Sequence, residues 1–296
     1  MEKIKNILNA LECPLALLDA RPFRAEEDGR DYAVWKLDTD QGTMVLKRTN
    51  EAERAVYGSF FQEGGPVPKV YAFAEVEGEV WMLMEFISGQ SMSRCTRDRL
   101  IRTLDALCDS QSRWWGDESH TDIGYGFHRC WSGRHKRLMY MGELTEAYEA
   151  YLEEFSRVPR TLCNDDLLPF NVLADEERAV ILDWEYGGIL PYPSALARFL
   201  AFGEEGNDLF QMTEADRSFA LTYYYEKLVA PRGISRAEYD RTMDLFFFKE
   251  YSEWVYCAAV SGDYEMEYYK KYGEKARILA RKLGLLKEKE VTQCFD

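Results

Sequence analysis

Apolar and polar residues alternate along the first third of the chain with the period of two that is typical of a half-buried strand. The pattern runs through residues 32–40 and resumes at 43–48, after a turn at Gly42. Two further strand-like runs cover residues 69–74 and 79–86. Because neighbouring strands joined by short turns pair antiparallel, this region predicts an antiparallel sheet.

Apolar residues spaced three and four apart predict helices around and after this sheet. One helix is expected at about residues 2–12 and another over 50–62, where Asn50 can cap the first turn. A long amphipathic helix is expected from Thr96 onward, whereas residues 116–137 give no clear assignment. Further helices are expected at about 143–156, 194–202, 214–229, 235–260 and 264–284. The pattern therefore predicts an α+β protein with a larger, mostly helical second part.

One strand-like segment interrupts the helices. Residues 162–174 and 179–183 are two short apolar runs that end in acidic residues, and the polar turn 175–178 separates them. Such a pattern predicts a hairpin. This hairpin contains the polar residues on which the functional argument depends.

Composition and charge narrow the classes of function. The 296 residues are 46% hydrophobic, enough for a large core, and carry a formal net charge of −15 with a pI near 4.8. A nucleic acid partner is disfavoured because its phosphates would be repelled. A cationic ligand is favoured, although an acidic surface can also serve solubility alone.

The cysteines and the N-terminus indicate the cellular compartment. Seven cysteines without a C-x-x-C pair argue against a disulfide framework or a structural zinc site. Residues 1–14 lack the apolar stretch of a signal peptide or membrane span. We therefore expect a cytoplasmic protein with reduced thiols and no membrane partner.

The predicted hairpin carries the residue types that phosphoryl transfer requires. Its sequence NDDLLPFN places four residues between Asp166 and Asn171, and Asp183 follows twelve positions later in LDWE. Phosphoryl transfer uses one carboxylate to orient the attacking hydroxyl, an amide oxygen and a second carboxylate to hold Mg²⁺, and a lysine on the phosphates.

These motifs resemble those of the aminoglycoside phosphotransferase and choline kinase superfamily, which has a protein-kinase-like fold. The resemblance implies a bilobal protein with an N-lobe at residues 1–87 and a C-lobe with the catalytic hairpin at 88–296. It also implies that Asp166 is the catalytic base or the residue that orients the acceptor hydroxyl, and that Asn171 and Asp183 bind Mg²⁺.

The resemblance extends upstream to a nucleotide site. Lys47 looks like the strand lysine that binds nucleotide phosphates, and Glu53 looks like its partner on the next helix. Residues Glu85, Phe86 and Ile87 look like the hinge whose backbone binds the purine base. The implied cofactors are Mg²⁺ and ATP or GTP, and the implied activity is transfer to a small-molecule hydroxyl.

The chain departs from the family pattern at the catalytic loop. Asn164, Asp165 and Leu168 replace a histidine, a glycine and a second histidine, and Ala195 replaces an acid that braces the loop. We expect Asn164 to support the loop through short hydrogen bonds of its own. The nucleotide loop at residues 24–31 has one glycine and several acids, which predicts weaker phosphate binding or an altered donor preference.

The acceptor is the least determined part of the prediction. Candidate lining residues on the C-terminal helices are Glu250, Glu253, Trp254 and Asp263, with Glu265 and Tyr268 nearby. Carboxylates and aromatic rings together suit an amine, such as an aminoglycoside or an amino alcohol. The family also phosphorylates homoserine, methylthioribose and fructosamines, and the oligomeric state stays open.

Each feature also has an ordinary structural explanation. Lys47 can be a solvated strand lysine, Asp183 an acid at a strand end, and Trp254 a core aromatic. His120, His128 and His135 have spacings that fit no helical ligand pair, so we expect no metal site there. An alternative function is a pseudokinase-like module that binds a nucleotide or metabolite without efficient transfer.

Overall fold

The computed structural model describes residues 2–24, 31–207 and 210–286. Its first part is a five-stranded antiparallel sheet in the order β1-β2-β3-β5-β4. The strands are β1 Leu17–Arg24, β2 Asp31–Thr39, β3 Gly42–Thr49, β4 Val70–Val76 and β5 Glu79–Glu85. The sequence pattern missed β1, whose exposed outer positions and two register shifts obscure the alternation.

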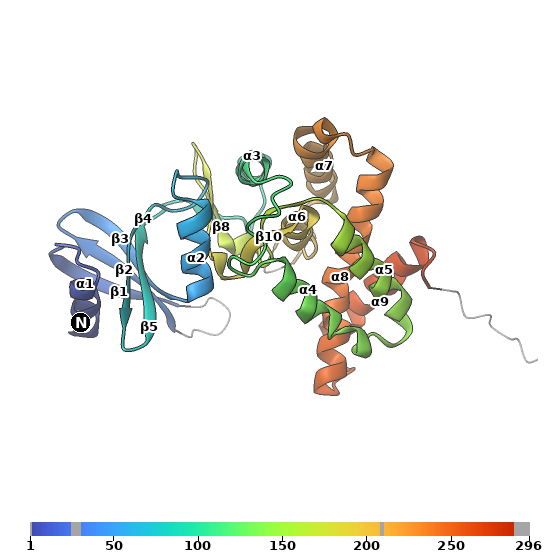
Figure 1. Cartoon of the computed structure of the whole chain (residues 1–296), viewed down its shortest axis with the longest axis horizontal. Helices are drawn as coiled ribbons and strands as arrows, with labels where there is room; N and C mark the ends of the chain where they lie inside the picture. The colour runs from blue at the N-terminus through green and yellow to red at the C-terminus, as the bar shows by residue number, and fades with distance from the viewer. Residues whose placement is uncertain (1, 25–30, 208–209, 287–296) are drawn as a thin grey trace, which may run out of the picture.

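Two helices accompany the sheet. Helix α1 Glu2–Ala10 packs against the strands, and α2 Glu51–Phe60 lies between the sheet and the second part of the molecule (Figure 1). In α1 the spacing of Ile4, Ile7 and Leu8 buries one face in a small core with strand residues such as Trp81. In α2 the Asn50 side chain accepts a hydrogen bond from the Glu53 amide at 2.9 Å, which caps the helix as expected. Figure 1 shows α2 beside the junction with the helical part.

The second part is mostly helical. Its helices are α3 Arg97–Arg113, α4 Phe127–His135, α5 Thr145–Arg157, α6 Pro193–Leu200, α7 Glu214–Tyr224, α8 Arg236–Ser261 and α9 Glu267–Lys282. A π-helical turn, Tyr225–Val229, continues α7, and α4 lies in the segment that the sequence left unassigned. One continuous core joins α3, α5, α6 and α8 with the inner side of α2. The expected α+β architecture is confirmed.

The expected hairpin divides between two small sheets. Strand β7 Arg160–Asn164 pairs with β10 Gly187–Pro191, which the sequence did not predict. Strand β8 Val172–Ala174 pairs with β9 Ala179–Ile181 and with β6 Gln90–Ser91. Residues 162–174 are therefore not one strand. The loop between β7 and β8 and the turn after β9 are held at the junction of the two parts of the molecule.

Two remaining expectations concern the cysteines and the membrane. Within the described ranges, Cys108, Cys130 and Cys163 are buried free thiols and Cys257 is exposed, while Cys294 lies outside them. None of the helices among the described residues is both long and apolar enough to span a bilayer.

Candidate active site

A partly buried group of ion pairs connects the sheet to the loop after β9. Lys47 on β3 places its Nζ 2.7 Å from a Glu53 carboxylate oxygen and 2.7 Å from Asp183 Oδ1. Burial lowers the pKa of Lys47, but the two carboxylates outweigh it, so the pKa lies above its usual value. Lys47 therefore stays charged and joins two parts of the chain that are 136 residues apart.

Glu53 fixes this arrangement because its carboxylate has several partners. Its side chain is 1% exposed, and it accepts hydrogen bonds from the Thr49 hydroxyl and, at 3.0 Å, from the Trp184 amide. Trp184 follows Asp183 directly, so α2 determines the position of this turn. The turn also requires a left-handed backbone at Asp183, with φ 57° and ψ 66°.

Asn164 connects this turn to the loop that contains Asp166. Its Nδ2 donates to the carbonyl oxygens of Asp183 at 2.9 Å and Leu182 at 3.2 Å. Its Oδ1 accepts from the Asp166 amide at 3.0 Å. One short amide side chain therefore holds both loops. The sequence led us to expect that Asn164 would support the catalytic loop through short hydrogen bonds of its own.

Asn171 is held against the same loop. Its Nδ2 donates to the Asp166 carbonyl oxygen at 3.0 Å, and its own carbonyl oxygen accepts from the Leu182 amide at 2.8 Å. This leaves the side-chain Oδ1 of Asn171 as an acceptor. The backbone of residues 164–171 is thus tied to the turn at Asp183 at several points.

Two arginines that the sequence analysis did not single out hold the acids of the loop. Arg198 on α6 donates to Asp166 Oδ1 at 2.7 Å and to Glu250 at 3.2 Å. Arg134 on α4 binds both carboxylate oxygens of Asp165, at 2.5 and 2.7 Å. Burial raises the pKa of Asp165, but Arg134, together with Lys249 and Arg198, more than offsets this, and the pKa lies below its usual value.

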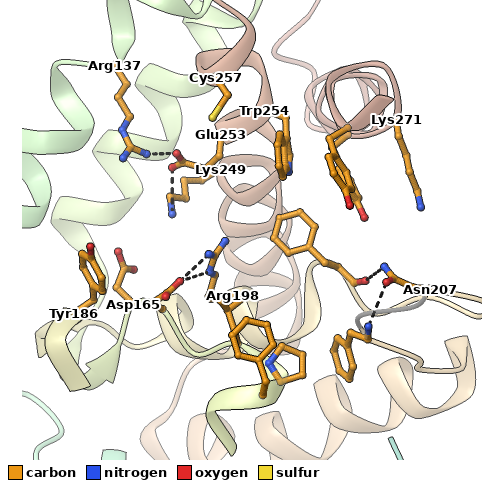
Figure 2. A pocket seen from close by; sticks show the side chains of 18 of the residues that line it. Arg137, Asp165, Tyr186, Arg198, Asn207, Lys249, Glu253, Trp254, Cys257 and Lys271 are labelled. Atoms are coloured by element: carbon orange, nitrogen blue, oxygen red, sulfur yellow. Dashed lines mark hydrogen bonds and ion pairs between the residues drawn. The ribbon is translucent and has the colours of Figure 1, made fainter. Parts of the chain in front are cut away.

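A cavity of about 810 Å³ opens beside Asp166 (Figure 2). The loop at 165–170 forms one wall, and α8 and α9 form another. Glu253 and Trp254 line the cavity as expected. Glu250 lies beneath the lining and is buried, with ion pairs to Arg198 and Lys249. Asp263 is exposed beyond the end of α8 and does not belong to the lining.

A comparison with protein families identifies this architecture. The model of the phosphotransferase enzyme family matches residues 19–226, which include the sheet, both loops and α6. The chain belongs to the phosphotransferase enzyme family. It is therefore a small-molecule kinase, as the sequence resemblance implied. No curated protein matches the chain.

Solved structures of other phosphotransferases share the fold at low sequence identity. The aminoglycoside phosphotransferase APH(4)-Ia is 13% identical with a TM-score of 0.61, and the match covers 94% of this chain and 97% of that one. An aminoglycoside phosphotransferase from Alicyclobacillus acidocaldarius is 12% identical with a TM-score of 0.58 and 95% coverage of both chains. A mutant of APH(4)-Ia, 14% identical with a TM-score of 0.58 and coverage of 94% and 97%, was solved as a ternary complex with ADP and hygromycin B.

The expected hinge of this phosphotransferase begins where the inner strand β5 ends. Glu85 ends β5, and its side chain pairs with Arg178 at 2.6 Å. The Phe86 ring lies 4.6 Å from the Lys36 ammonium, and Ile87 is buried. In the acidic loop at 24–31, residues 25–30 lie outside the described residues.

The donor set of the phosphotransferase fits a magnesium ion. Asn171 offers an amide oxygen, and Asp183 offers the carboxylate oxygen that Lys47 does not hold. Hard oxygen ligands of this kind suit Mg²⁺. The histidines are elsewhere: His120 pairs with Asp117 at 2.9 Å. Among the described residues, no group of three or more histidine, cysteine or acidic side chains forms a metal cluster.

Proposed function

We propose that this phosphotransferase moves the terminal phosphoryl group of ATP or GTP to a hydroxyl of a small molecule bound in the cavity between the loop and helices α8 and α9. The observation that carries the proposal is the position of Asp166. Its carboxylate faces the cavity, and its backbone is tied through Asn164 and Asn171 to the turn that bears Asp183.

The residues divide the work of the reaction between them. Lys47 binds donor phosphates, and Asn171 and Asp183 hold Mg²⁺, which neutralises charge on the phosphates when it is bound. Asp166 orients the acceptor hydroxyl and takes its proton as the new P–O bond forms and the bond to the leaving diphosphate breaks. Arg198 keeps the Asp166 carboxylate oriented through two hydrogen bonds.

The test is phosphoryl transfer in the presence of Mg²⁺, with ATP and GTP compared, against a panel of aminoglycosides, amino alcohols, sugars and hydroxy acids. Asp166→Asn keeps the size of the side chain but removes the base. We expect kcat to fall at least about a hundredfold, with nucleotide binding retained. Circular dichroism and thermal unfolding serve as the control for folding of the variant.

Nucleotide binding without turnover on any acceptor would instead favour the pseudokinase-like alternative. The charge of the acceptor is a separate question. The sequence favoured a cationic acceptor because of the acids on α8 and beyond. Two of those acids, Glu250 and Glu253, already pair with Arg198 and Arg137 in the folded protein.

A further inference from the structure

The cavity of this acidic protein is lined by a group of cations. Although the chain has a formal net charge of −15, Arg134, Arg137, Arg198, Lys249 and Lys271 all contribute to the lining. They come from α4, the segment after it, α6, α8 and α9. These five cations share the lining with four acids, Asp165, Asp166, Glu253 and Glu267. The cavity therefore lacks the large excess of acids that the chain has as a whole.

Each acid deep in the cavity already has a cationic partner. Arg134 pairs with Asp165, and Arg198 pairs with Asp166. Glu253 pairs with Arg137 and, at 3.4 Å, with Lys249. An ammonium group that enters the cavity and pairs with one of these acids would have to displace the cation that the acid already holds. The ammonium group and the displaced side chain would then lie close together in a partly desolvated site, where their repulsion is strong.

The cations keep donors for an anion. Among the described residues, Arg137 donates one terminal nitrogen to Glu253. Its side chain is 31% exposed. Lys271 is 42% exposed on the opposite side and pairs with Glu204 at 2.6 Å. Figure 2 shows Arg137 and Lys271 on either side of Trp254. A guanidinium fork suits a carboxylate or phosphate group.

An aromatic wall lies between these two cations. The rings of Trp254 and Tyr268 stack with centroids 4.6 Å apart, and Tyr272 stacks against Tyr268 at 6.1 Å. Such a wall offers apolar surface to the carbon skeleton of a ligand. The cavity therefore combines a base at one end, an apolar wall and anion-binding donors.

We propose that the acceptor is a hydroxylated compound bearing an anionic group, a carboxylate or a phosphate, which binds at Arg137. This inference deepens the proposed function, because it rests on phosphoryl transfer at Asp166. The anionic group fixes the acceptor between Arg137 and the aromatic wall, and one hydroxyl then reaches the Asp166 carboxylate. The proposal reverses the sign of the charge that composition alone favoured.

The experiment compares acceptors that share a skeleton and differ in charge. One series is glucose, glucosamine, glucuronate and glucose 6-phosphate, and a second is glycerol, ethanolamine, glycerate and glycerol phosphate. Binding is measured by calorimetry with Mg²⁺ and a non-hydrolysable ATP analogue, and transfer is measured with ATP. We expect an anionic member to exceed its neutral and cationic counterparts at least about tenfold in affinity and in kcat/KM. Comparison of glucuronate and glycerate with glucose 6-phosphate and glycerol phosphate shows whether the cavity prefers a carboxylate or a phosphate.

Variants of Arg137 test the assigned contact. Arg137→Gln should raise KM for the preferred anion about tenfold and leave kcat nearly unchanged, because the base and metal residues are untouched. Arg137→Glu should abolish the preference for an anion. Lys136→Gln, at the exposed neighbouring position, is the matched control and should leave both constants unchanged. An unaltered preference for the anion in Arg137→Gln would overturn the assignment.

The outcomes for the two proposals are separable. Preference for glucosamine or ethanolamine would overturn the anionic acceptor and leave phosphoryl transfer established. Binding of an anion without transfer to any acceptor would support the inference about the cavity and overturn the proposed function. Failure of every anionic compound both to bind and to accept phosphate would overturn the inference.

Discussion

At the scale of single residues, Arg198 has the clearest influence on the chemistry. It lies between Asp166 and the buried Glu250 and contacts both. Burial lowers the pKa of Arg198, but the two carboxylates outweigh it and the pKa is raised. Arg198 is thus a positioning residue that keeps Asp166 facing the cavity.

Replacing Arg198 by Gln should therefore affect both stability and rate. Glu250 would lose one of its two cationic partners, so we expect the free energy of unfolding to fall by about 3 kcal/mol. The value of kcat should fall more than tenfold because Asp166 loses its orientation. Denaturant unfolding and steady-state kinetics measure these effects, and Arg198→Lys should restore part of both. Equal kcat values in all three proteins would contradict the role.

Asp165 provides a test by pH. Because Arg134 lowers its pKa in the folded protein below the ordinary value of 3.8, the unfolded chain binds this proton first as the pH falls. The stabilisation is complete above the unfolded pKa and is lost progressively as the pH falls from the unfolded pKa to the folded pKa. The difference in stability between wild type and Asp165→Asn should be constant above about pH 5 and shrink below about pH 4.

Chemical denaturation at a series of pH values measures this difference. Asp109→Asn is the matched control, because it removes an exposed ion pair with Arg113 on α3 and should change the free energy of unfolding by less than about 1 kcal/mol. A constant difference for Asp165→Asn down to pH 3 would show that the pair does not perturb the carboxyl group.

The sequence predicted some of these residues and missed others for a physical reason. Lys47, Glu53, Asp166, Asn171 and Asp183 lie at fixed spacings in local motifs, and the structure brings them together at the junction of the two parts of the molecule. Arg134, Arg137 and Arg198 act across 31 to 116 residues of sequence. Nothing in the local pattern distinguishes such an arginine from a surface one.

At the scale of elements, long-range pairing accounts for what the periodicity failed to predict. Most helices appear where the spacing of three and four predicts them. The exception is α4, which lies in the segment that the sequence left unassigned. Strands β7 and β10 pair although more than twenty residues separate them in the sequence. Every residue of β10 is buried. A fully buried strand of five residues has no alternation to detect.

Gly188 on β10 shows how closely this small sheet is packed. A Cβ atom at Gly188 would lie 2.9–3.0 Å from backbone atoms of residues 123–126, which cannot move as a side chain can. Gly188→Ala should therefore lower the free energy of unfolding by about 2 kcal/mol. Gly58 in α2 has no atom within 4 Å of that position, so Gly58→Ala should stabilise the protein by about 1 kcal/mol.

Thermal and chemical unfolding of the two alanine variants provide the comparison. The same substitution is made in both, so differences in the unfolded chain largely cancel. Equal stability of the two variants would contradict the close packing of residues 123–126 against Gly188.

At the scale of the whole molecule, the pairing of Lys47 on β3 with Asp183 in the turn after β9 joins the sheet to the second part of the chain. Lys47 therefore occupies one oxygen of a carboxylate expected to hold Mg²⁺. In Lys47→Met the acids at 53 and 183 lose their shared cation, so the free energy of unfolding should fall by about 3 kcal/mol.

Magnesium alone should then stabilise Lys47→Met more than wild type, since the ion no longer competes with the ammonium group for Asp183. Thermal unfolding with and without MgCl₂ measures the difference. Lys36→Met, on the neighbouring strand beside Phe86, is the control and should respond as wild type does. A smaller magnesium response in Lys47→Met than in wild type would contradict Asp183 as a ligand.

The link that Asn164 makes between the two loops also limits which side chains position 164 can accept without loss of stability. The related pattern has a histidine at position 164 and an acid at position 195, where this chain has a fully buried alanine. Restoring the histidine alone would remove three hydrogen bonds, and restoring the acid alone would bury an unpaired charge. Each of these two substitutions, made alone, should therefore destabilise the folded protein.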